Sequence, residues 1–162
     1  MKRFSILLVL NFTLHQLNAQ SLNYEQIAFN FFIDSVFENN YKDARIVQFS
    51  GYTEKELTSF SIYQNCFSGK ESLTKKLYEK SFNKVVDSKQ LKIDNINNIK
   101  FKKINKQSSR RLKLFIFPAN EIDGNHFVLI QVIKKNYYRD AYMFEIDKTG
   151  SILIYCKTGM LY

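Results

Sequence analysis

Histidine and cysteine are the residues of this chain best suited to catalysis, and there are few of them. The 162-residue sequence contains His15, His126, Cys66 and Cys156. A thiolate beside an imidazole base attacks substrates at neutral pH, so either cysteine paired with His126 is the sharpest enzyme hypothesis. However, Cys66 precedes the nearest predicted helix by several residues, and Cys156 falls within a predicted strand. A zinc site needs about three or four protein ligands, so we predict no metal site.

Carboxylates offer acid–base chemistry at two places. Asp34 and Glu38 lie four residues apart on a predicted helix, and Glu145 and Asp147 alternate along a predicted strand. A glycosidase needs two carboxyl groups facing each other across about 5 to 9.5 Å, and no sequence feature places these pairs across a cleft. The chain also lacks a Gly-x-Ser-x-Gly motif and a glycine-rich phosphate loop. We therefore predict no catalytic residue and no cofactor.

A basic run is the one local feature with binding potential. It extends to Lys113 without an acidic residue, and the candidate binding residues are Lys100, Lys102, Lys103, Lys106, Arg110 and Arg111. A positive hairpin here would bind an anionic polymer through salt-sensitive contacts. The run has no aromatic platform on which bases would stack, so nucleic acid is not expected. Lysines that protect an edge strand against aggregation explain the run equally well.

The first 19 residues have the three parts of a secretory signal peptide. Lys2 and Arg3 precede a short apolar stretch, and Ala19 offers a cleavage site. The stretch is shorter than the roughly 20 apolar residues that span a bilayer, although an uncleaved anchor is an alternative. We expect residues 20–162 to form one domain in the periplasm or outside the cell, without a transmembrane segment. Loss of the two basic residues lowers the formal charge from +9 to +7.

Export gives Cys66 and Cys156 a second interpretation. In an oxidising compartment a lone pair of cysteines favours a disulfide. The bond would close a loop of about 90 residues and stabilise the fold by about 4–5 kcal/mol. It would also remove the thiol that a Cys–His nucleophile needs, and the sequence leaves both interpretations open.

Hydrophobic periodicity predicts an α+β domain with an N-terminal helix packed on a curved antiparallel sheet. The helix is expected over Tyr24–Glu38, and a second one over Glu71–Val86. Segment Ala44–Tyr52 fits a strand or a continued helix, and Leu57–Tyr63 alternates like a strand.

The C-terminal half predicts a four-stranded antiparallel meander. Its strands are expected at Arg111–Phe117, His126–Lys134, Asp140–Asp147 and Ser151–Lys157. Asp123-Gly124 and Asp147–Gly150 are the hairpin turn signals. This order of elements resembles the cystatin-like and nuclear-transport-factor-like layouts, and the chain also resembles small secreted bacterial proteins of unassigned role. The resemblance covers most of the mature chain and implies a pocket between helix and sheet.

Two functions of different classes follow. The first is an exported, non-enzymatic module that binds an anionic polymer or an envelope protein through the sheet or the basic hairpin. The alternative is a small extracytoplasmic hydrolase with a pocket between helix and sheet. The hydrolase requires His126, Asp34 or Glu145 to lie inside that pocket beside a second polar group.

Overall fold

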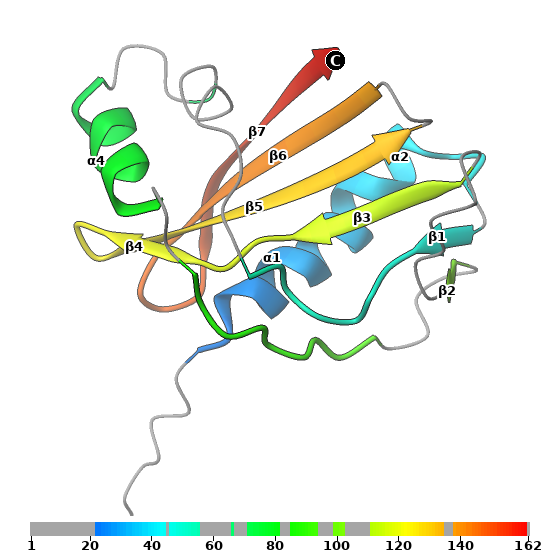
Figure 1. Cartoon of the computed structure of the whole chain (residues 1–162), viewed down its shortest axis with the longest axis horizontal. Helices are drawn as coiled ribbons and strands as arrows, with labels where there is room; N and C mark the ends of the chain where they lie inside the picture. Colours follow the sequence, from blue (N-terminus) through cyan, green and yellow to red (C-terminus); the bar gives the residue numbers. More distant parts are fainter. Residues whose placement is uncertain are drawn as a thin grey trace, which may run out of the picture.

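The helix predicted near the N-terminus begins at Tyr24 and is capped by Asn23, whose Oδ1 accepts a hydrogen bond from the backbone N of Gln26 at 2.9 Å. It comprises α1 (Tyr24–Phe31), a π-helical turn η1 (Phe32–Phe37) and a final turn α2 (Glu38–Asn40). In the computed structural model this helix lies across one face of the sheet (Figure 1). The prediction of an N-terminal helix is therefore confirmed.

The structure describes residues 22–44, 46–55, 66, 71–81, 85–93, 99–102, 111–134 and 138–161. Several sequence-based expectations lie outside these residues. They are the signal peptide over 1–19, the strand-like segment Leu57–Tyr63, and the basic residues Lys103, Lys106 and Arg110. No helix of the described part is long and apolar enough to cross a membrane.

Seven strands form one mixed, mostly antiparallel sheet. They are β1 (Ile46–Gln48), β2 (Lys100–Lys102), β3 (Leu112–Ile116), β4 (Asn120–Ile122), β5 (Asn125–Lys134), β6 (Tyr138–Ile146) and β7 (Ile152–Leu161). The strand order is β2-β1-β3-β5-β6-β7, and β4 pairs with β5. The predicted α+β class and C-terminal meander are confirmed.

The β1 edge departs from the antiparallel expectation. Strand β1 runs parallel to both β2 and β3 and lies between them. Parallel neighbours require long connections, and long stretches of chain separate β1 from both partners. Strands β2 and β3, which lie at the two ends of the basic run, are on opposite sides of β1, so the predicted pairing of these two segments as a hairpin is wrong.

The sheet is covered on both faces. The helix face carries a buried aromatic cluster that includes Phe29, Phe32 and Phe144. On the opposite face, Leu77 of helix α4 (Glu71–Ser81) belongs to a smaller cluster with Leu129 of β5. Burial on both faces explains why β5 is apolar at successive positions rather than alternating.

Helix α4 is shorter than predicted. The side chain of Val85 is 66% exposed, and the backbone N of Val86 donates to Lys55 O at 3.0 Å. The expectation of a helix to Val86 is therefore wrong. The backbone of Val86 is thus bonded to residue 55 and does not continue the helix.

A disulfide joins Cys66 to Cys156 of β7, with a Cα–Cα distance of 5.6 Å. The predicted bond is confirmed, and it links the segment before α4 to the far edge of the sheet. Since both sulfurs are bonded, the Cys–His nucleophile hypothesis is wrong for this state of the chain.

The predicted hairpin turns are also present. Asp123 and Gly124 have φ values of 52° and 84°, as the turn between β4 and β5 requires. Gly150 has a φ of 90° in the turn before β7. There Asp147 Oδ1 accepts hydrogen bonds from the side chain of Thr149 and the backbone N of Ser151, which lower the pKa of this carboxyl.

Candidate ligand-binding pocket

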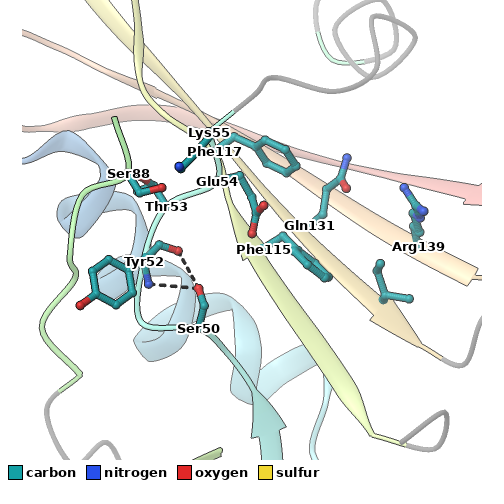
Figure 2. A pocket seen from close by; sticks show the side chains of 11 residues that line it. Ser50, Tyr52, Thr53, Glu54, Lys55, Ser88, Phe115, Phe117, Gln131 and Arg139 are labelled. Carbon is teal, nitrogen blue, oxygen red and sulfur yellow. Dashed lines mark hydrogen bonds between the residues drawn. The ribbon is translucent and has the colours of Figure 1, made fainter. Parts of the chain in front are cut away.

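A cavity of about 630 Å³ lies on the sheet face opposite helix α1. Register places Phe115 opposite Gln131 and Ile133 opposite Arg139, so these four side chains share one face. Figure 2 shows the residues around the cavity. They are Ser50, Tyr52, Thr53, Glu54, Lys55, Ser88, Phe115, Phe117, Gln131, Ile133 and Arg139.

Residues 50–55 form one wall of the cavity and are fixed by backbone hydrogen bonds. Gly51, with a φ of 82°, makes the bend that directs this segment over the sheet. Thr53 N donates to Lys89 O at 2.9 Å, and Glu54 N donates to Ile116 O at 2.7 Å. The wall is thus tied to both the 85–93 segment and the end of β3, which positions Glu54 above the sheet.

Gln131 is the most informative side chain in the cavity. It is 2% exposed, and its Nε2 has no hydrogen-bond partner among the residues that the structure describes. Most buried side-chain polar atoms in native proteins are paired, and leaving one unpaired costs about 1–3 kcal/mol. The Gln131 amide is thus an unsatisfied donor on a residue that lines the cavity.

Glu54 brings a carboxylate to the same cavity. Burial raises the pKa of Glu54 above its usual range. No described residue forms an ion pair or a side-chain hydrogen bond with this carboxylate. Figure 2 shows Glu54 on one side of the rings of Phe115 and Phe117, and Gln131 and Arg139 on the other.

Arg139, near the start of β6, adds a half-buried guanidinium to the cavity. Phe115, Phe117 and Ile133 give the cavity an apolar floor, and Figure 2 shows the two phenylalanine rings between the acidic and basic sides. An apolar cavity with a few converging polar groups is the usual form of a small-molecule site. The arrangement suits a ligand with an apolar body and polar ends.

The described members of the basic run do not reach this cavity. Lys100 and Lys102 are exposed on β2 and Arg111 is exposed just before β3. None of the three lines the cavity. Lys100 and Lys102 lie on β2, the edge strand opposite β7, where lysines are typical of a protected edge.

The residues that the hydrolase hypothesis needs are not brought together. His126 stacks on Tyr24 with ring centroids 3.5 Å apart, and burial lowers its pKa despite nearby carboxylates. Glu145 accepts a hydrogen bond from Asn125 Nδ2 at 2.7 Å, and Asp34 is exposed. None of these residues lines the cavity.

The cavity is also on the other side of the sheet from the pocket that the resemblance implied. The described helix–sheet contact is filled by aromatic rings, such as Phe32 and Tyr142 with centroids 5.0 Å apart. The aromatic side chains at this contact therefore serve to pack the core.

Two other buried carboxylates bind groups of the protein itself. Glu25 of α1 accepts hydrogen bonds from Lys89 Nζ at 2.9 Å and Ala119 N at 3.0 Å. Asp140 of β6 accepts a hydrogen bond from Tyr41 at 2.5 Å and pairs with Lys134 Nζ at 2.8 Å. Both join the helix region to distant parts of the chain, so we assign them structural roles.

Sequence reasoning did not single out Glu54, Gln131 or Arg139. Gln131 left a signal, because it is the one polar residue within the apolar run Phe127–Ile133. No sequence feature pointed to Glu54 or Arg139, since charged residues in such positions are usually solvated.

Comparison of the chain with protein-family models, curated proteins and solved structures found no match. The geometry of the cavity therefore carries the functional argument.

Proposed function

We propose that this chain is an exported, non-enzymatic binding module that holds a small ligand between residues 50–55 and the sheet. The observation that carries the proposal is the unpaired Gln131 Nε2 in a cavity with an apolar floor. A protein that retains such an atom loses stability. A ligand acceptor that pairs with it gives a reason for its presence.

The size and lining of the cavity support this function. Small-molecule sites have volumes of about 300–1,000 Å³, and this one measures about 630 Å³. Its phenylalanine rings supply apolar contact, while Gln131, Glu54 and Arg139 offer a donor, an anion and a cation. Export is supported by the leading apolar segment and by the Cys66–Cys156 bond, which is typical of oxidising compartments.

Binding can be tested with two matched glutamine variants. Gln131→Leu removes the unpaired donor in the cavity, and Gln48→Leu removes a glutamine of β1 that is also buried, with an unpaired Oε1, but does not line the cavity. The probes are 3-phenylpropanoate, phenethylamine and L-phenylalanyl-L-leucine, measured by calorimetry and thermal shift.

At least one probe should bind the natural chain and bind Gln131→Leu about fivefold or more weakly. The Gln131→Leu protein should also be at least as stable without ligand, because an unpaired polar group has been replaced by an apolar one. Gln48→Leu should bind like the natural chain. The proposal is wrong if no probe binds, or if both leucine variants weaken binding equally.

A further inference from the structure

We propose that β7 pairs with β7 of a second copy of this chain, so that two sheets join into one across a two-fold axis. The proposal concerns an edge of the sheet and is independent of the cavity. It follows from an unprotected edge strand and from exposed apolar side chains that lie on both of its faces.

The two edges of the sheet differ in how they are protected. Strand β2 at one edge has 3 residues, and Lys100 and Lys102 are exposed on it. Strand β7 at the other edge has 10 residues, and Lys157 is its only charged residue. Among the described strands, none pairs with the outer side of β7 (Figure 1). A long apolar edge strand of this kind readily pairs with a strand of another chain.

Three successive apolar residues near the start of β7 are exposed to solvent. The exposed fractions are 53% for Leu153, 52% for Ile154 and 44% for Tyr155. Tyr155 lies on the helix face, because its ring centroid is 5.8 Å from that of Phe31 in α1. Ile154, the preceding residue, points to the opposite face. A partner packed on one face would cover only one of the two, whereas a strand added along the edge covers both.

The backbone of β7 is suited to such an addition. Its register with β6 shifts only near its start, between Ile152 and Ile154. From Ile154 to Leu161 each residue has a partner on β6, and no proline interrupts the strand. Alternate residues therefore direct their N–H and C=O groups away from β6. These groups specify an extended chain as the partner.

The charges on β7 favour a second copy as that extended chain. An antiparallel pair with its two-fold axis within residues 153–155 brings the exposed apolar residues of both copies together. The two Lys157 residues are then at least about four positions apart, or about 13 Å, which exceeds the Debye length of about 8 Å. Lys157 Nζ also lies 3.8 Å from Asp140 Oδ2 of its own chain. No charge on β7 thus calls for an oppositely charged partner.

Sedimentation equilibrium of the natural chain, Ile154→Lys and Val85→Lys tests the pairing. Val85 is the matched control, because it is 66% exposed and belongs to the segment that bonds to residues 50–55. The natural chain and Val85→Lys should dimerise equally well. Ile154→Lys should dimerise about tenfold or more weakly, because each copy brings an added charge to the shared edge.

Salt separates self-association from binding to an anionic partner. The chain is basic, with a formal charge of +9, so two copies repel each other and added salt screens this repulsion. The dimer should therefore tighten as the salt concentration rises. A contact between the basic surface and an anionic polymer would weaken instead, and a dimer that weakens with salt would contradict the proposal.

Amide hydrogen exchange of the natural chain gives a second readout that needs no variant. Amides of β7 should exchange more slowly at concentrations where the chain is dimeric, while those of β2 should not change. A natural chain that stays monomeric up to about 1 mM would refute the proposal. The same holds for a dimer that forms without added protection of β7, that Ile154→Lys leaves intact, or that both lysine variants weaken equally.

Discussion

Replacement of Asp140 by alanine should destabilise the fold by about 2–4 kcal/mol. The Asp140 side chain is 2% exposed and pairs with Lys134 Nζ at 2.8 Å. It also accepts a hydrogen bond from Tyr41 at 2.5 Å, and the Tyr41 and Tyr142 hydroxyls lie 2.9 Å apart. Removal of the carboxylate breaks this network at its centre.

The solvent exposure of Lys134 and Tyr41 sets the size of the expected loss of stability. Breaking a fully buried ion pair costs about 3–5 kcal/mol. The Lys134 side chain is 34% exposed and turns toward water when its partner is removed, which lowers the cost. Tyr41 is 6% exposed, so its hydroxyl cannot turn toward water in the same way. Loss of a hydrogen bond to a charged group, about 1.5–3 kcal/mol, therefore forms most of the expected change.

Urea unfolding of single and double variants measures this prediction. Tyr41→Phe and Asp140→Asn should couple by about 1–2 kcal/mol in a double-mutant cycle. Lys76→Ala is the control, since it breaks a 2.7 Å ion pair with Asp123 whose side chains are 52% and 69% exposed. It should cost less than about 1 kcal/mol. A loss below about 1 kcal/mol for Asp140→Ala, or independent effects in the cycle, would refute the reasoning.

Three further predictions concern stability. Replacing Cys66 and Cys156 by serine should lower the free energy of unfolding by about 4–5 kcal/mol in the chain-entropy model, given their separation of 90 residues. Urea unfolding of the natural chain with a reductant should show the same loss. Equal stability of the oxidised and reduced chains would contradict this prediction. Burial raises the pKa of Tyr142 to about 12 and that of Tyr41 further, so the unfolded state ionises first. The free energy of unfolding should then be independent of these tyrosines below about pH 10 and fall above it by up to about 1.4 kcal/mol per pH unit for each tyrosine. The slope should be smaller in Tyr41→Phe. Identical slopes in the natural chain and the variant would be evidence against this. Burial raises the pKa of Glu54, so the charged carboxylate destabilises the folded state once the pH has risen through that pKa. Glu54→Gln should therefore raise the melting temperature by about 2–4 °C at pH 7. The gain should vanish in acid, where Glu54 is protonated in both the folded and the unfolded state.

Local signals in the sequence predicted the C-terminal half of the fold well. Asp123-Gly124 and Gly150 mark turns that need positive φ, and the strands between them are long. The N-terminal helix was predicted equally well, because Asn23 caps a helix that carries a broad apolar stripe. In both cases neighbouring residues specify the structure.

The pairing of strands at the β1 edge could not be predicted from such local signals. Strands β1 and β2 have three residues each, and their pairing joins Ile46 to Lys100 across a long stretch of chain. Short strands carry little periodicity, so tertiary contacts decide their partners. The disulfide was left open for a similar reason, since spacing does not show that Cys66 and Cys156 approach to 5.6 Å.

The cavity has the same dependence on tertiary structure. Glu54 and Arg139 come from distant segments, and the hydrogen bond from Glu54 N to Ile116 O and the pairing of Ile133 with Arg139 help to bring them to one face. Gln131 was detectable as a polar residue in an apolar strand. That signal indicates an unusual buried amide without identifying what it contacts.

The side-chain amide resonances of Gln131 give the most direct test of binding at this cavity. They can be assigned in a nitrogen–proton correlation spectrum by their loss in Gln131→Leu, with Gln48→Leu as reference. Titration with L-phenylalanyl-L-leucine should shift them saturably, together with backbone signals of residues 50–55. Saturable shifts confined to other parts of the chain, or an unchanged Gln131 signal at millimolar peptide, would contradict the proposed site.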